Sequence, residues 1–113
     1  MGNPIVHFEI TGPDQPALVA FYQELFDWTL QHHPEMSYSL VHTEDGSIDG
    51  GIGAAQDGNP AVRFYIQVPD INAHLERIEA AGGRTLMARE ELPMVTLAMF
   101  ADPQGNVIGL VEG

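Results

Sequence analysis

The sequence predicts an α+β fold made of two tandem modules, each with the element order β-α-β-β-β. The first observation is an internal repeat, in which residues 2–17 return at 58–73 with nine identical positions out of sixteen. Chance would give roughly one identity, and self-similarity at a fixed spacing marks a repeated structural unit. The second observation is the length of 113 residues, which fits one compact domain. We divide this domain into module one (1–56) and module two (57–113).

The first element of each module is predicted to be a strand with one apolar face and one polar face. Apolar and polar residues alternate over 6–11 and again over 62–68, and a period of two is typical of a half-buried strand. The polar side chains are expected to line a trough in a cupped mixed sheet, with the helices on the outer face. The apolar side chains expected under the helices are Val6, Phe8, Ile10, Val62, Phe64, Ile66, Ile108 and Leu110.

A helix is predicted to follow each first strand. Asp14 and Asp70 come directly after the strands and can cap the helices. The apolar residues of 18–26 recur at the spacing of a helix with one buried face. Gly82 ends the second helix, because glycine tolerates the left-handed conformation. Three short strands complete each module, at 28–33, 36–43 and 47–54 in module one and at 84–89, 94–101 and 106–112 in module two.

The composition excludes several classes of function. Four basic residues stand against sixteen acidic ones, for a formal net charge of −12. Nucleic-acid-binding proteins need clustered Lys and Arg, so no nucleic-acid partner is expected. No apolar run reaches the ~20 residues of a membrane span, and the start of the chain does not read as a secretory signal. Cysteine is absent, which removes disulfides and thiolate ligands, and we expect a cytoplasmic protein without a membrane partner.

Four segments make the chain similar to a known superfamily. They are His7, the aromatic stretch 21–28, Ala81-Gly82-Gly83 and Asp102-Pro103-Gln104-Gly105-Asn106. Together with the paired modules, they resemble the vicinal oxygen chelate superfamily of glyoxalase I, bleomycin-resistance proteins and extradiol dioxygenases, over essentially the full chain. The resemblance implies a single domain over 1–113, a homodimer, and a cup that holds a small molecule and often a divalent metal.

The resemblance also implies where a metal would be bound, and those positions lack ligands. Glyoxalase-type members place four ligands on four strands, two in each module. The first position matches His7, but the third is Arg63, and the second and fourth are Gly53 and Gly109; a register shift of two would put Gly51 at the second. Glycine has no side-chain donor and arginine is a fixed cation, whereas a divalent metal needs several N or O donors. We therefore predict no metal and no other cofactor.

The polar faces of the first strands supply the candidate ligand-binding residues. His7 and Glu9 are also the candidate catalytic residues, since a histidine pKa near 6.5 suits acid–base chemistry. His7 could instead be a histidine satisfied by its neighbours at the sheet surface. Arg63 could pair with Glu9, or it could bind a carboxylate or phosphate of a ligand. Tyr65 completes this predicted lining.

Two further features complete the predicted ligand-binding set. Gly53 and Gly109 are expected to widen the trough and to let a ligand approach the backbone. If alternate residues of 38–42 point into the trough, His42 joins it and could form a non-standard metal site with the two candidate catalytic residues. That arrangement places Ser39 on the helix side, where a polar side chain is not expected.

These observations favour a homodimeric protein that binds a small organic molecule in the trough without the family's metal. The acidic charge favours a cationic ligand, or it serves only to keep the protein soluble. One alternative is an enzyme, either a glyoxalase-like lyase, a dioxygenase, or a metal-free isomerase that uses His7 or Glu9. A second alternative is a non-catalytic interaction module. The sequence leaves the question of catalysis open.

Overall fold

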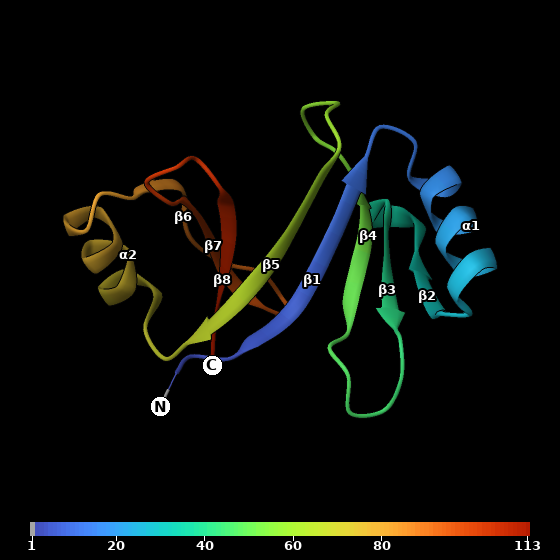
Figure 1. The fold of residues 1–113 in the computed structure, drawn as a ribbon, viewed down its shortest axis with the longest axis horizontal. Coiled ribbons are helices and arrows are strands. Elements are labelled where there is room, and N and C mark those ends of the chain that lie inside the picture. The colour runs from blue at the N-terminus through green and yellow to red at the C-terminus, as the bar shows by residue number, and fades with distance from the viewer. Residues whose placement is uncertain (1) are drawn as a thin grey trace. The chain divides into compact units, whose positions relative to one another are not determined.

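The computed structural model describes residues 2–113 of the chain. Over these residues the elements follow the order β-α-β-β-β twice, with one added turn of 3-10 helix (Figure 1). The two predicted modules are therefore confirmed. They fall into two compact units, of which one is His7–Arg63 and the other joins Phe64–Gly113 to the stretch that ends at Val6. The module boundary at 56/57 stays a prediction.

The unit His7–Arg63 is built on a mixed sheet. Its strands have the order β2-β3-β4-β1, in which β1 and β4 are parallel and the other neighbours are antiparallel. The turn η1 (Pro34–Met36) joins β2 to β3. The parallel pairing brings the first and last strands of the module together, so residues 8–12 lie beside 50–54. The strands are β1 (Ile5–Gly12), β2 (Thr29–His33), β3 (Tyr38–His42) and β4 (Gly50–Ala54).

Helix α1 (Gln15–Phe26) covers one face of this sheet. The predicted cap is confirmed, because the Asp14 carboxylate accepts a hydrogen bond from the backbone N–H of Ala17 at 3.1 Å. Burial of apolar surface between helix and sheet stabilises the unit. The buried residues at this contact are Val19, Val41 and Ile52, with Phe8, Ile10, Leu18, Tyr22, Trp28 and Leu30 packed around them.

The apolar stripe predicted for the first helix is only partly buried. Tyr22 packs on Trp28 with ring centroids 5.4 Å apart and nearly parallel planes. Phe21, Leu25 and Phe26 are each more than half exposed. The helix therefore turns Val19 and Tyr22 toward the sheet, and part of the predicted stripe lies on the surface.

The second unit repeats this arrangement. Its strands have the order β5-β8-β7-β6, with β5 and β8 parallel and the other neighbours antiparallel. Helix α2 (Ile71–Ala80) begins after Asp70, whose carboxylate accepts from the N–H of Ala73 at 3.1 Å as predicted. Within 2–113, no helix is both long and apolar enough to cross a membrane. The strands are β5 (Ala61–Val68), β6 (Arg84–Glu91), β7 (Thr96–Ala101) and β8 (Val107–Glu112).

Two apolar residues of β5 are not covered as predicted. Val62 is 76% exposed and Phe64 is 37% exposed. The buried cluster around α2 includes Ile66 and Val68 at the other end of the strand. Helix α2 has ten residues and covers only the end of β5 that carries Ile66 and Val68. The alternation of apolar and polar residues in β5 therefore extends beyond the part that the helix covers.

The strand pairing corrects the alignment of the two modules at the glycines. Glu9 of β1 lies beside Gly51 of β4, and its repeat equivalent Tyr65 of β5 lies beside Gly109 of β8. Gly109 therefore corresponds to Gly51 and not to Gly53, two residues away. The repeat loses its register because β6 is longer than β2 and its pairing with β7 is irregular.

Candidate functional site

Four polar side chains form a hydrogen-bonded row on the sheet face opposite α1, within the unit His7–Arg63. His7 and Glu9 alternate along β1 with apolar residues that pack toward α1, so they project from the other face. The Tyr38 hydroxyl donates to Oε2 of Glu9 at 3.1 Å, and Nε2 of His7 lies 3.1 Å from the same hydroxyl. Arg63 donates from Nη1 to Oε1 of Glu9 at 2.9 Å. We call the four side chains of His7, Glu9, Tyr38 and Arg63 the His7–Arg63 row, which is distinct from the unit His7–Arg63 that contains them.

Of the two roles left open for Arg63, the structure shows the ion pair with Glu9. The Arg63 side chain is 20% exposed and the Glu9 side chain 13% exposed, so both charges lie largely out of water. The pair is net neutral, and each partner offsets the cost of burying the other. The guanidinium Nε is also buried and has no hydrogen-bond partner within the described structure.

Burial favours the neutral form of His7 in this row. Burial lowers its pKa below the ordinary value, although the carboxylates of Glu9 and Asp49 act in the opposite direction. Because Tyr38 donates its only hydroxyl proton to Glu9, the neutral ring of His7 donates from Nε2 to the Tyr38 oxygen. The hydrogen bond to Tyr38 therefore sets the tautomer of His7, and burial favours its neutral form by lowering its pKa.

The glycines of β4 make room for the ring of Tyr38. A Cβ atom at Gly51 would collide with the hydroxyl end of the Tyr38 ring, and one at Gly53 would lie 2.7 Å from a ring carbon. The prediction that Gly53 simply widens an open trough is therefore wrong, since an aromatic side chain of the same unit takes up the space. A contact between Gly53 and a ligand stays a prediction.

A hollow of about 340 Å³ lies on the same face as the row. His7 lines it on one side, and His42 with Asp49 lines it on another. The hollow therefore brings together two of the predicted ligand-binding residues, and through His7 it adjoins the row. The residues that line it are His7, Thr29, Leu30, Gln31, Leu40, Val41, His42, Asp49 and Gly50.

His42 does not form the non-standard metal site that its position allowed. Its Nδ1 is 2.9 Å from a carboxylate oxygen of Asp49, and its Nε2 is 3.1 Å from Asp45. Both carboxylates belong to the β3–β4 connection, and His42 is about half exposed there. The hydrogen bond with Asp49 is the main cause that raises the pKa of His42 above its ordinary value.

The contacts of His42 predict a pH-dependent contribution to stability. Because its folded pKa is raised, the contribution is complete below the unfolded pKa near 6.5 and is lost as the pH rises through the folded value. His42→Asn should therefore lower the free energy of unfolding at pH 5.5 and have less effect at pH 9. Urea unfolding at both pH values measures this, with His74→Asn as the control. A deficit that grows as the pH rises would contradict the prediction.

A family model described as a glyoxalase-like domain matches residues 7–111, almost the whole chain. The chain belongs to the glyoxalase-like domain family. Among proteins similar in sequence, the anthracycline biosynthesis protein DnrV of Streptomyces peucetius is 28% identical over 130 aligned positions. The match covers 94% of this chain and 47% of DnrV, so this glyoxalase-like chain spans about half the length of that relative.

Solved structures show the fold of the glyoxalase-like chain. Methylmalonyl-CoA epimerase from Mycobacterium tuberculosis matches 96% of this chain and 86% of its own, with a TM-score of 0.70 and 17% identity. A glyoxalase/bleomycin resistance protein/dioxygenase superfamily member from Vibrio splendidus 12B01 matches 99% of this chain and 100% of its own, with a TM-score of 0.70 and 18% identity. These neighbours confirm the predicted α+β fold, and the family match over residues 7–111 confirms the predicted glyoxalase-like superfamily.

The residues at the superfamily's metal positions do not fit a divalent ion. His7 shares its Nε2 with the Tyr38 hydroxyl, and Arg63 brings a positive charge that repels a cation. Gly51, which the strand pairing puts in place of Gly53, and Gly109 have no side-chain donor. Among residues 2–113, no group of three or more His, Asp or Glu side chains is arranged to hold a metal.

Two predicted site residues lie in the other unit. Tyr65 is only 6% exposed, and a Cβ atom at Gly109 would collide with its ring. Gly109 therefore makes room for a tyrosine ring, as Gly51 does in the unit His7–Arg63. The expectation that Gly109 leaves open space is wrong, and ligand contacts by Tyr65 and Gly109 stay predictions.

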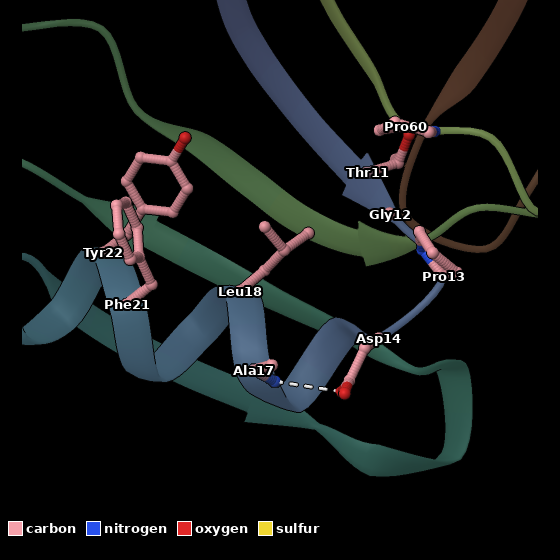
Figure 2. A pocket seen from close by; sticks show the side chains of 9 residues that line it. All are labelled: Thr11, Gly12, Pro13, Asp14, Ala17, Leu18, Phe21, Tyr22 and Pro60. Carbon is pink, nitrogen blue, oxygen red and sulfur yellow. Dashed lines mark hydrogen bonds between the residues drawn. The ribbon is translucent and has the colours of Figure 1, made fainter.

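A second hollow, of about 410 Å³, lies on the helix side of the unit His7–Arg63 (Figure 2). Leu18, Phe21 and Tyr22 of α1 line it together with Pro60 and the turn that follows β1. The capping hydrogen bond, from the N–H of Ala17 to the Asp14 carboxylate, closes that turn. None of the predicted site residues lines this hollow, although it is larger than the one beside His7.

Two features were not predicted from the sequence. They are the position of Tyr38 at the centre of the His7–Arg63 row and the burial of Ser39. Ser39 is 2% exposed on the helix side. Gln15 donates to its hydroxyl at 3.1 Å, and Nδ1 of His32 lies 2.8 Å from it. A polar side chain fits there because it has partners. The sequence did contain a signal for Tyr38. Tyr38 alternates along β3 with residues that face the helix, such as Val41, and the neighbouring strand β4 carries glycines opposite it.

Proposed function

We propose that this glyoxalase-like chain binds a small organic molecule, without a metal ion, in the hollow beside His7. The observation that carries the proposal is the position of His7, which lines the hollow and also belongs to the His7–Arg63 row. Ligand sites typically combine apolar surface with a few fixed polar groups. Leu40 supplies apolar surface here, and His7 and Asp49 supply polar groups.

The charges around the hollow favour a neutral or cationic ligand over an anion. The Arg63 guanidinium is already paired with Glu9. Asp49 lines the hollow and Asp45 lies on the far side of His42. The chain as a whole carries a net charge of −12, which attracts cations and repels anions. This supports the preference for cationic compounds expected from the composition.

Thermal-shift screening tests the proposal with sets of neutral, cationic and carboxylated small molecules. A ligand that binds the folded state raises the melting temperature as its concentration increases. We expect hits among the neutral and cationic sets. Leu40→Trp, which fills the hollow, should abolish the shift, whereas His74→Ala on α2 should keep it. A screen without hits would favour an interaction module, and a hit that Leu40→Trp still binds would contradict this location.

A metal-free isomerase is the second candidate, and the state of His7 favours it. A neutral ring with its proton on Nε2 can accept a proton from a bound molecule at Nδ1, and burial favours the neutral form. Glu9 is less suited to that step, because Arg63 and Tyr38 both bind its carboxylate. Exchange of substrate C–H for deuterium in heavy water, lost in His7→Ala, would support catalysis; a ligand that binds without exchange supports the binding protein.

We include a homodimer and a cytoplasmic location in the proposal. The exposed side chains of Phe21, Leu25 and Phe26 on α1 support self-association, since such apolar groups gain stability when a partner covers them. Light scattering of the purified protein should give twice the mass of one chain, and a monomer would contradict the dimer. The absence of cysteine supports a reducing compartment.

A further inference from the structure

The His7–Arg63 row already holds one phenol hydroxyl, that of Tyr38. The hydroxyl donates to Oε2 of Glu9 at 3.1 Å and accepts from Nε2 of His7 at 3.1 Å. Arg63 fixes the other oxygen of Glu9 at 2.9 Å. Glu9 and His7 thus offer one acceptor and one donor to the same oxygen, which is the pattern that a phenol needs.

The backbone beneath Tyr38 is shaped for a flat ring. Gly51 and Gly53 lie under the ring, and a side chain at either position would occupy its space. Tyr38 is the first residue of β3 and follows Ser37, which has a positive φ of 50° at the end of η1. Its side chain is partly exposed, and its hydroxyl lies 3.1 Å from Nε2 of His7, which lines the hollow.

We propose that the ligand is a hydroxylated aromatic molecule whose phenol hydroxyl replaces that of Tyr38 between His7 and Glu9. This rests on the proposed function, because the same hollow receives the rest of the molecule. The Tyr38 side chain then acts as an internal competitor. The ligand can bind only when the Tyr38 side chain has turned away. The apparent affinity is therefore the intrinsic affinity multiplied by the fraction of molecules in that state.

Two probes of matched shape test the ligand class, 2-naphthol and 2-methoxynaphthalene. The ether cannot donate a hydrogen bond to Glu9, and a hydrogen bond to a charged group is worth about tenfold or more in affinity. Titration calorimetry of the full chain at pH 7 should show 2-naphthol binding at least about tenfold more tightly than the ether. Equal affinities would overturn the phenol class while leaving the proposed binding function in place.

Variants of Tyr38 test the replacement step. Tyr38→Ala removes the competitor and should tighten 2-naphthol binding about tenfold. Tyr38→Phe keeps the ring but removes the hydroxyl that binds Glu9 and His7, and should tighten binding in the same direction if the alanine variant does not fold. Tyr22→Phe, which removes a hydroxyl on the helix side, should leave the affinity unchanged. Weaker binding to both Tyr38 variants, or no binding to any form of the protein, would overturn the proposal; the small-molecule screen then decides the proposed function separately.

Discussion

Gly109→Glu is expected to lower the free energy of unfolding by about 3 kcal/mol, the upper end of the cost of overpacking a buried site. A Cβ atom at Gly109 would collide with the ring of Tyr65, and that ring is 6% exposed and has little room to move. The substitution places a carboxylate at a position where the superfamily has a metal ligand. We therefore expect destabilisation without a gain in metal affinity, as measured by denaturant unfolding and by zinc titration.

Tyr65→Ala combined with Gly109→Glu is the control for this mechanism. If the collision with the ring causes the loss, the double variant should cost less than the sum of the single variants, because contacting residues are not additive. An additive double variant, or a Gly109→Glu protein as stable as the wild type, would contradict the packing described here.

Arg63→Met is expected to lower the free energy of unfolding by about 2–3 kcal/mol, somewhat less than the loss of a partner from a fully buried ion pair. Methionine keeps apolar contacts but leaves the Glu9 carboxylate, 13% exposed, without its counter-charge. Denaturant unfolding at neutral pH measures the loss. The effect is expected to be far larger than that of Arg77→Met, because Arg77 is exposed on α2.

Glu9→Gln separates the charge effect from lost packing. A glutamine has no charge to leave unpaired, so Arg63→Met should cost less in the Glu9→Gln background than in the wild type. Equal costs in both backgrounds would mean that the ion pair is not the reason for the loss.

The modules were predictable because their signals are local. Alternation over 6–11 and 62–68, the caps Asp14 and Asp70, and the glycine after the second helix each act within a few residues. Gly82 does adopt the left-handed conformation, with a φ of 102°. Such features depend on backbone sterics and nearest neighbours, and the repeat showed the alternation and the caps twice.

The glycines were harder to interpret because their meaning depends on other strands. The repeat aligned Gly53 with Gly109, but pairing with β1 and β5 makes Gly51 the equivalent. The sequence also does not indicate which side chain packs against a glycine. Tyr38 lies thirteen positions before Gly51 and still covers it, and such a contact is fixed by strand register rather than by local sequence.

The candidate site was predicted in part for the same reason. His7, Glu9 and Arg63 share a face by simple alternation, and the structure joins them. Tyr38, which links His7 to Glu9, reaches them from β3, and the partners of His42 come from the connection that follows it. Tyr38 is about thirty positions from His7 and Glu9, and the partners of His42 lie in a connection outside the strand, so alternation along one strand did not reveal either set of contacts.

Binding of an organic molecule beside His7 without a metal is tested most directly by NMR of the histidine rings. The protein is treated with a chelator and titrated with the best ligand of the small-molecule screen. We expect the ring protons of His7 and His42 to shift in one saturable curve, those of His74 to stay in place, and added zinc or magnesium to leave the curve unchanged. Histidine signals that respond to the ligand only after metal is added would contradict this account.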